Sequence, residues 1–171
     1  MIVGVNVRIT DASGPTRVAA RYNAGSPMST TSETRIRVRY AETDQMGVVY
    51  YANYIVWMEV GRVELCRACG FRYRDMEEQD GVLLAVAETN CRYLSPARFD
   101  DEVTVKAWIE KADRRMVRFG YEMRKDETVL ATGYTKHIFL NRQFRPTRLP
   151  EKYFEMFGIQ NRPRMDTDSQ G

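Results

Sequence analysis

The sequence predicts an α+β domain in which about five antiparallel strands wrap around one long central helix. The segment after residues 44–47 is apolar on almost every side when its residues are spaced at about 100°, and such a helix must be covered on most sides. Further along, apolar and polar residues alternate in segments joined by short turns, which is typical of antiparallel hairpins. One strand, a buried helix and then four strands place the helix against one face of the sheet.

Composition limits the possible classes of protein. The chain has 171 residues, enough for one domain with a sizeable core. Its net charge of +3 does not indicate a nucleic-acid partner, and no apolar run reaches the roughly 18 residues of a membrane span. Cys66 and Cys69 have C-x-x-C spacing late in the apolar helix, but Cys91 stands alone and His137 is the only histidine. We interpret the cysteines as buried structural thiols in a reducing, cytoplasmic compartment, with no metal site.

Three regions differ in their residue patterns. Residues 1–33 show no sustained period, so we expect a disordered extension or an upstream segment ahead of a start at Met28. Residues 34–159 carry the periodic segments and form the predicted domain. Residues 160–171 are predicted to be a flexible tail. The sequence contains no internal repeat and no sign of a second domain.

The predicted elements follow from the period of each segment. Apolar residues alternate with arginines over 34–40, which predicts a strand. The helix should end near Gly70, and the turn signal Asp80-Gly81 closes a short connection. Four further strands are predicted over 82–94, 103–110, 117–124 and 129–140, and a short helix over 151–157.

A few polar residues interrupt the apolar helix. Asn53, Glu64 and Arg67 fall on one narrow stripe when the residues are placed on a helical wheel. Glu59 and Arg62, three residues apart, lie roughly opposite this stripe. Charges at these positions require each other as partners, an interface with another molecule, or a function.

A motif at the start of the helix resembles that of a known family. Residues 44–54 (DQMGVVYYANY) are similar to the signature of the hotdog-fold acyl-CoA thioesterases of the 4-hydroxybenzoyl-CoA thioesterase group, which includes the Tol–Pal-associated thioesterases. The similarity recurs at residues 57–62 and 93–101 and covers about residues 35–157. The resemblance implies a hotdog fold, in which the sheet curls around the helix, and acyl-CoA thioesterase activity.

The resemblance places the catalytic carboxylate at Asp44, with Gly47 as the turn residue. A carboxylate near a helix N-terminus and an apolar pocket can act on a thioester as a nucleophile or general base. From the residues alone, the alternative is an ordinary turn aspartate that hydrogen-bonds to its own backbone. Glu42, two residues earlier, is the local competitor and is expected to face solvent.

The start of the helix offers hydrogen-bond donors for the thioester oxygen. No Ser, Thr, Asp or Asn occurs at residues 48–52, so the first amides of the helix lack an obvious side-chain cap. The resemblance implies that the backbone amide of Tyr51 is the oxyanion donor and that Ala52 opens the helix. The alternative is that Asn53 caps a helix that begins slightly later.

One position departs from the family pattern. The Tol–Pal-associated branch usually has an assisting His where this chain has Tyr51, as aromatic-acyl thioesterases do; the difference weakens an assignment to that branch and a role for the Tyr51 side chain as acid or base. Glu59 is the second-choice catalytic carboxylate, because some hotdog thioesterases use an acid on the central helix across a dimer interface. Its alternative is an ion pair with Arg62. His137 is interpreted as a satisfied sheet histidine.

The implied substrate is an acyl-CoA, with coenzyme A as part of the substrate and no separate cofactor. The pantetheine arm needs an apolar slot, for which Tyr50 and Tyr54 are candidates, and the phosphates need Arg or Lys. Arg98 is the candidate nearest to the motif. Other candidates are Arg114, Arg115, Arg118, Arg142, Arg145 and Arg148. The alternative for each of these arginines, Arg98 included, is an ordinary solvated surface charge, and the sequence favours this alternative.

Two other classes of function stay open. A non-catalytic module that binds acyl-CoA or acyl carrier protein would use the same fold, although Asp44 argues against it. A hotdog dehydratase would need a His beside its carboxylate, and His137 is far away in sequence. A sheet wrapped on one helix leaves an edge strand open, and the family builds its active sites between subunits, so we expect a homodimer or homotetramer.

Overall fold

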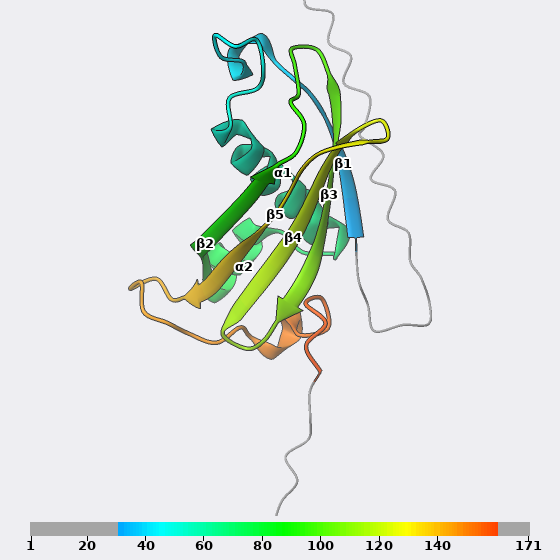
Figure 1. Ribbon diagram of the computed structural model, residues 1–171. Coiled ribbons are helices and arrows are strands. Elements are labelled where there is room, and N and C mark those ends of the chain that lie inside the picture. Colours follow the sequence, from blue (N-terminus) through cyan, green and yellow to red (C-terminus); the bar gives the residue numbers. More distant parts are fainter. Residues whose placement is uncertain (1–30, 161–171) are drawn as a thin grey trace, which may run out of the picture.

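The computed structural model describes residues 31–160, which form one sheet wrapped around a long helix (Figure 1). All strand pairs are antiparallel, and the order across the sheet is β1-β3-β4-β5-β2. This arrangement confirms the predicted α+β hotdog architecture. The elements are β1 (Thr31–Arg37), η1 (Tyr40–Glu42), α1 (Ala52–Ala68), α2 (Tyr73–Asp80), β2 (Leu83–Tyr93), β3 (Glu102–Ala112), β4 (Met116–Lys125), β5 (Thr128–Leu140) and η2 (Glu151–Tyr153).

The core lies between α1 and the sheet, and α1 packs mainly against β1 and β3. Gly61 allows this close approach, because a Cβ atom at this position would lie 2.8 Å from Cγ1 of Val105. Fully buried side chains from both layers fill the space, and the largest are Trp57, Tyr121, Phe119, Phe139, Met58 and Leu65. No helix within residues 31–160 is long and apolar enough to cross a membrane.

The first strand differs from its prediction in position. β1 runs over Thr31–Arg37 rather than 34–40, because residues 31–33 pair with Lys106, Ala107 and Trp108 of β3. Residues 31–33, which the sequence analysis assigned to the first segment, therefore belong to β1. Tyr40 belongs to η1 and is 78% exposed, although the alternating pattern assigned it to the buried face. The disorder expected for the rest of the first segment and for the tail falls outside the described residues.

The helix is less completely covered than its apolar sequence predicts. Ile55, Val56 and Val60 are 40%, 51% and 37% exposed, and Glu59 beside them is exposed as well. Among residues 31–160, Glu59 and Arg62 form no ion pair, so this predicted alternative is wrong for the single chain. The guanidinium of Arg62 instead turns inward, where Nη1 lies 3.4 Å from Nε2 of His137.

The exposed side of α1 continues onto the edge strand β2. Val86 pairs with His137, whose side chain is fully buried, so Val86 lies on the α1 side of the sheet, yet it is 57% exposed. We call Ile55, Val56, Val60 and Val86 the helix–edge surface. β2 has a neighbour on one side only within the described chain, and a register shift follows Val86. An open edge beside exposed apolar side chains invites pairing with another chain.

Gly133 of β5 pairs with Cys91 of β2 at a position that has no space for a side chain. A Cβ atom at this position would lie 2.2 Å from the backbone oxygen of Asn90 and 2.6 Å from Cε of Met58. We expect Gly133→Ala to lower the free energy of unfolding by about 1–3 kcal/mol, the usual cost of overpacking, as measured by urea denaturation. Thr132→Ala, on the other face of the same strand, should cost less. Equal stability of Gly133→Ala and the wild type would show that the strands separate without penalty.

Candidate active site

The loop that carries Asp44 is a tight turn held by hydrogen bonds between its own backbone groups. The Asp44 N–H donates to the Val48 carbonyl at 2.9 Å, the Gly47 N–H donates to the Asp44 carbonyl at 2.9 Å, and Thr43 bridges to Val49. Gly47 has φ of +72°, a conformation that side chains disfavour, which explains why glycine stands here. The predicted roles of Asp44 and Gly47 as loop residues agree with this geometry.

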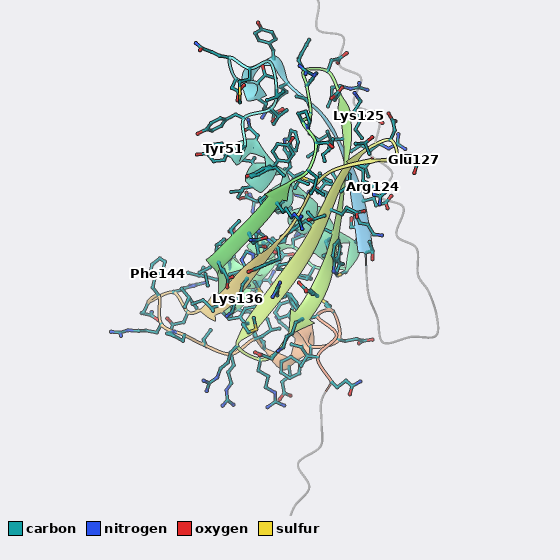
Figure 2. All side chains as sticks on the ribbon, viewed as in Figure 1. Tyr51, Arg124, Lys125, Glu127, Lys136 and Phe144 are labelled. Carbon is teal, nitrogen blue, oxygen red and sulfur yellow. The ribbon has the colours of Figure 1, made fainter. Side chains whose placement is uncertain are left out.

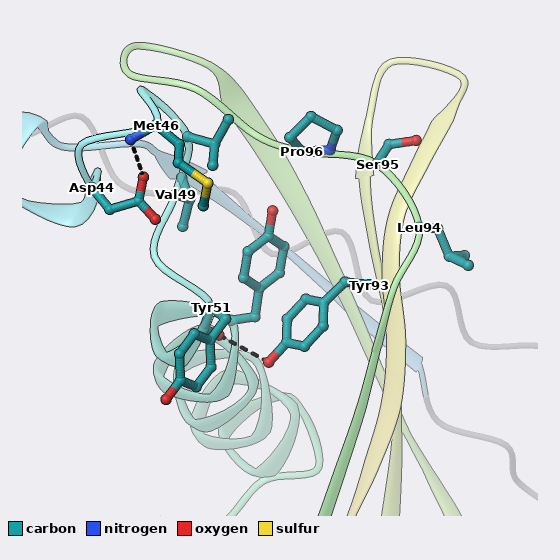
Figure 3. Close-up of a pocket in the computed structure, with 10 residues that line it drawn as sticks. Asp44, Met46, Val49, Tyr51, Tyr93, Leu94, Ser95 and Pro96 are labelled. Carbon is teal, nitrogen blue, oxygen red and sulfur yellow. Dashed lines mark hydrogen bonds between the residues drawn. The ribbon is translucent and has the colours of Figure 1, made fainter.

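A pocket of about 300 Å³ opens between this loop, the start of α1 and the segment after β2 (Figure 3). Asp44 lines it from the loop and Tyr51 from the start of the helix. Tyr54 and Tyr93 add aromatic walls, and residues 94–96 close the opposite side. The segment behind residues 94–96 is fixed to the loop, because the Val49 N–H donates to the Ala97 carbonyl at 2.8 Å. The pocket therefore brings together Asp44 and Tyr51, the two residues that the sequence analysis identified as candidates for thioester hydrolysis.

Asp44 makes the turn contact and lines the pocket at the same time. Its Oδ1 accepts the Met46 N–H at 2.8 Å, the self-bonding expected of an ordinary turn aspartate. Within residues 31–160, no hydrogen bond involves the second oxygen, Oδ2. One carboxylate oxygen is thus held in place by the turn, while the other is free to act on a substrate or a water molecule.

The start of α1 presents free amide groups at the same pocket. Tyr51 is the N-cap residue and no side chain caps the helix. No backbone hydrogen bond within the described chain uses the N–H of Tyr51 or Ala52. Asn53 does not cap a later start, because its Nδ2 donates to the Glu42 carbonyl at 2.8 Å. Uncapped amides at a helix N-terminus carry partial positive charge and suit a developing oxyanion.

Tyr93 fixes the helix start from the other side of the pocket. Its hydroxyl donates to the Tyr51 carbonyl at 3.1 Å, as Figure 3 shows, and its ring packs edge-on against the ring of Tyr54 at 5.2 Å. Burial, followed by a hydrogen bond with Cys91, raises the pKa of Tyr93 to about 12, so the hydroxyl stays protonated and donates. The sequence motif included Tyr93 but gave no indication of this contact.

Glu42 is buried, which corrects the expectation that it faces solvent. The residue is 4% exposed, and its Oε1 accepts the Trp57 Nε1–H at 3.2 Å and an Arg39 guanidinium N–H at 2.9 Å. Its Oε2 accepts the Arg39 backbone N–H at 2.7 Å. Burial alone would raise the pKa of Glu42, but the hydrogen bonds from Arg39 and Trp57 outweigh it and lower the pKa.

The remaining candidates near the motif lie outside the pocket. Glu59 is an exposed residue two turns along α1. Tyr50 is 45% exposed and packs its ring on that of Tyr51 at 4.5 Å, but it does not line the cavity. Nη1 of Arg98 donates to the Gly47 carbonyl at 3.3 Å, so this arginine contacts the loop that carries Asp44. Of the proposed substrate contacts, only Tyr54 lines the pocket, and its hydroxyl accepts the Ala97 N–H at 3.1 Å.

Two of the other arginines proposed for the phosphates lie together in a groove away from the pocket. Arg115 and Arg148 line an open groove of about 630 Å³ beside the end of β5. Arg118 has other partners, since Nε lies 2.8 Å from Glu110 and the guanidinium stacks 3.6 Å from the Tyr134 ring. In Figure 2, Tyr51 at the start of α1 lies above the Phe144 loop that follows β5.

The thiols fit the structural role predicted for them. Cys66 is buried and Cys69 and Cys91 are half-buried, and none of the three forms a disulfide. Burial raises the pKa of Cys66 to about 12, which removes its reactivity at neutral pH. Within residues 31–160, no group of three or more His, Cys, Asp or Glu residues is placed to hold a metal ion.

Known proteins are similar to this chain in sequence and in fold. A model of the thioesterase superfamily matches residues 46–132, just over half of the chain. A putative acyl-CoA thioesterase of Bacillus subtilis is 40% identical over 71% of this chain and 89% of that protein. An acyl-acyl carrier protein thioesterase of Arabidopsis thaliana chloroplasts is 31% identical over 78% of this chain and 70% of its own length.

A solved structure adds agreement in three dimensions. The DHNA-CoA thioesterase of Staphylococcus aureus is 39% identical, with a TM-score of 0.68 over 72% of this chain and 83% of that one. Sequence and structure therefore lead to the same family, and its matched region contains the start of α1 and the pocket segment after β2. The chain is a hotdog-fold enzyme of the thioesterase superfamily.

Proposed function

We propose that this enzyme hydrolyses the thioester of an acyl-CoA to the free acid and coenzyme A. The observation that carries the proposal is the pocket in which a carboxylate with one free oxygen, Asp44, faces the uncapped start of α1. Hydrolysis needs a group that activates or replaces water and donors that stabilise the oxyanion. The names of the similar proteins, acyl-CoA and DHNA-CoA thioesterases, point to the same substrate class.

The reaction follows from these two groups. The thioester oxygen binds at the amide of Tyr51, which stabilises the negative charge that develops on it. Asp44 takes a proton from a water molecule whose oxygen attacks the carbonyl carbon, or attacks that carbon itself to form an anhydride that water then opens. In the first route the carbon–sulfur bond breaks and the departing sulfur takes up the proton that Asp44 removed from water. In the second route the sulfur leaves as a thiolate when the anhydride forms, and the water that opens the anhydride supplies the proton of the thiol. Both routes yield one acid and one thiol for each water consumed.

The pocket also limits the second candidate, a module that binds acyl-CoA without cleaving it. Such a module gains nothing from an unsatisfied carboxylate oxygen beside unsatisfied amides, since both lower stability when they are removed from water. A phosphopantetheine arm on an acyl carrier protein would present the same thioester as coenzyme A. The relative from Arabidopsis thaliana is named for that substrate, so carrier-protein thioesters belong in the test.

The test is an assay of thiol release from short, long, branched and aromatic acyl-CoAs and from one acyl carrier protein thioester. We expect turnover with at least one acyl-CoA, because Asp44 and the start of α1 line the same pocket. Binding by calorimetry without thiol release would favour the non-catalytic module. Release from the carrier protein alone would make acyl carrier protein, rather than coenzyme A, the substrate carrier.

We also propose that the working unit is a homodimer formed through the helix–edge surface, or a homotetramer built from two such dimers. Four apolar side chains there are exposed, and the edge of β2 is open to a second strand. Glu59 is exposed beside these side chains and forms no ion pair in the described chain, so a basic residue of a second copy would give it a partner. Pairing through this surface would cover apolar area and provide that ion pair.

Antiparallel pairing of two β2 strands would also extend the site. β2 runs from Leu83, opposite Leu140 at the groove end, to Tyr93 at the pocket. In an antiparallel pair the groove of one subunit therefore approaches the pocket of the other. Arg115 and Arg148 would then be available for the phosphates of a coenzyme A whose thioester lies near Asp44.

Val86→Arg is expected to give a monomer with little activity, because it places a charge among the apolar side chains of the proposed interface. Light scattering gives the mass, and the thiol-release assay at the same concentrations gives kcat. Arg124→Ala, near the end of β4 next to the turn to β5 (Figure 2), is the matched control and should leave both the mass and kcat unchanged. A fully active Val86→Arg monomer would exclude a site shared between subunits.

A further inference from the structure

We propose that Glu42 is a positioning residue for catalysis, which holds the Asp44 loop and the start of α1 at a fixed separation. The inference rests on the proposed function and deepens it. Asp44 and the amide of Tyr51 lie on two neighbouring segments, and Glu42 belongs to the first of them, two residues before Asp44. Glu42 bonds to the second segment through its side chain, which accepts from Trp57, and through its backbone carbonyl, which accepts from Tyr50 and Asn53.

The backbone of Glu42 fixes the residue that precedes the oxyanion donor. Its carbonyl accepts the Tyr50 N–H at 2.9 Å and the Asn53 Nδ2–H at 2.8 Å. Tyr50 is bonded directly to Tyr51, and Asn53 is in the first turn of α1. The same carbonyl therefore sets the position of the helix start and occupies the one nearby side chain that could have capped the free amides.

The side chain of Glu42 fixes the body of the helix. Its Oε1 accepts the indole N–H of Trp57, which is 1% exposed and lies in the second turn of α1. A carboxylate that is 4% exposed is costly to bury unless its oxygens are satisfied, and here they accept three hydrogen bonds, two of them from Arg39. Because Arg39 and Trp57 donate from different elements, the Glu42 carboxylate cannot move toward one donor without lengthening its hydrogen bond to the other.

The chain then carries this position to the catalytic carboxylate. Thr43 lies between Glu42 and Asp44 and is itself held by its bridge to Val49 and by its hydroxyl, which donates to the Tyr40 carbonyl at 2.8 Å. A displacement of Glu42 is therefore passed on to Asp44 rather than absorbed by a flexible link. A misplacement of about 1 Å can lower a rate on the order of 10²-fold, so such a link affects catalysis without touching the substrate.

The test is Glu42→Gln, which replaces one acceptor oxygen by an amide that repels the Arg39 N–H. We expect kcat to fall on the order of tenfold while KM for the best acyl-CoA changes less than about twofold. Trp57→Phe, which removes a single N–H donor and leaves the carboxylate in place, should lower kcat in the same direction if Glu42→Gln fails to fold.

A double-mutant cycle separates positioning from a general effect on stability. If Glu42 acts through Asp44, then Glu42→Gln should cost nothing further in an Asp44→Asn background. Asp80→Asn is the matched control, because Asp80 is an acid that bonds to Lys152 and Tyr153 at the far end of α2. It should lower the melting temperature and leave kcat unchanged.

Three results would overturn the inference, and they can be told apart. A Glu42→Gln protein with a lower melting temperature and normal kcat would make Glu42 a purely structural residue. Multiplicative losses in the double variant would show that Glu42 acts independently of Asp44, with the proposed function intact. A normal rate for Asp44→Asn alone would overturn the proposed mechanism together with this inference.

Discussion

Replacement of Asp44 by asparagine is expected to lower kcat on the order of 10²-fold or more, while binding of the acyl-CoA persists. Asparagine keeps the shape of aspartate, and its amide oxygen still accepts the Met46 N–H that Oδ1 accepts in the wild type. The substitution removes the negative charge and the basicity of the second oxygen. Steady-state thiol release gives kcat, and calorimetry on the inactive variant gives the dissociation constant.

The control for this prediction is an aspartate with the same local geometry away from the pocket. Asp113 accepts the Arg115 N–H at 2.7 Å and the Met116 N–H at 3.0 Å through its Oδ1, in the turn between β3 and β4. Asp113→Asn should leave kcat close to that of the wild type. If Asp44→Asn behaves in the same way, Asp44 is a turn residue only and Glu59 becomes the leading carboxylate, to be tested by Glu59→Gln.

The elements of the sheet were predictable because each depends on local pattern. Alternation over 103–110 and 117–124 located β3 and β4 to within a few residues, and Gly70 marked the end of α1. β1 was placed three residues late because the pattern of 34–40 does not reveal that residues 31–33 pair with β3. Pairing between strands far apart in the sequence, not the period of either strand, decides where a strand ends.

The coverage of α1 could not be predicted from its composition. An apolar helix must be buried against something, but the sequence does not state whether the partner is the same chain or another. The structure leaves Ile55, Val56 and Val60 exposed, next to Glu59. The all-round apolar pattern is therefore consistent with a helix that is covered by its own sheet on one flank and by a second subunit on the other.

The site divides in the same way between local and distant contacts. Asp44 and the uncapped start of α1 were found because the motif and the lack of capping residues are both local features. Glu42 was expected to face solvent because its decisive partner, Trp57, is 15 residues away and belongs to another element. Tyr93 reaches Tyr51 across 42 residues. Neither contact leaves a signal in one sequence without the fold.

The buried residue His137 is expected to make the free energy of unfolding depend strongly on pH. His137 is fully buried, and its Nε2 lies 2.8 Å from the Thr135 hydroxyl, which also bonds to the Tyr121 hydroxyl at 2.7 Å. Burial, followed by the charge of Arg62, lowers the pKa of His137 to about 3. The aromatic rings of Phe119 and Tyr121 complete its surroundings, so no described acid stands beside it to favour the charged form.

This pKa predicts that the protein loses stability in mild acid. The unfolded chain takes up a proton at His137 near pH 6.5, whereas the folded protein does so only near pH 3. The contribution of neutral His137 is therefore complete above pH 6.5 and falls continuously as the pH decreases toward 3, with a loss of about 3 kcal/mol at pH 4. Urea denaturation at pH 7 and pH 4 measures this loss.

The variant His137→Gln separates the histidine from the carboxylates, which titrate equally in both proteins. It should be less stable than the wild type at pH 7. Between pH 7 and pH 4, however, its free energy of unfolding should fall by about 3 kcal/mol less than that of the wild type. Parallel stability curves for the two proteins would show that another group controls the acid transition.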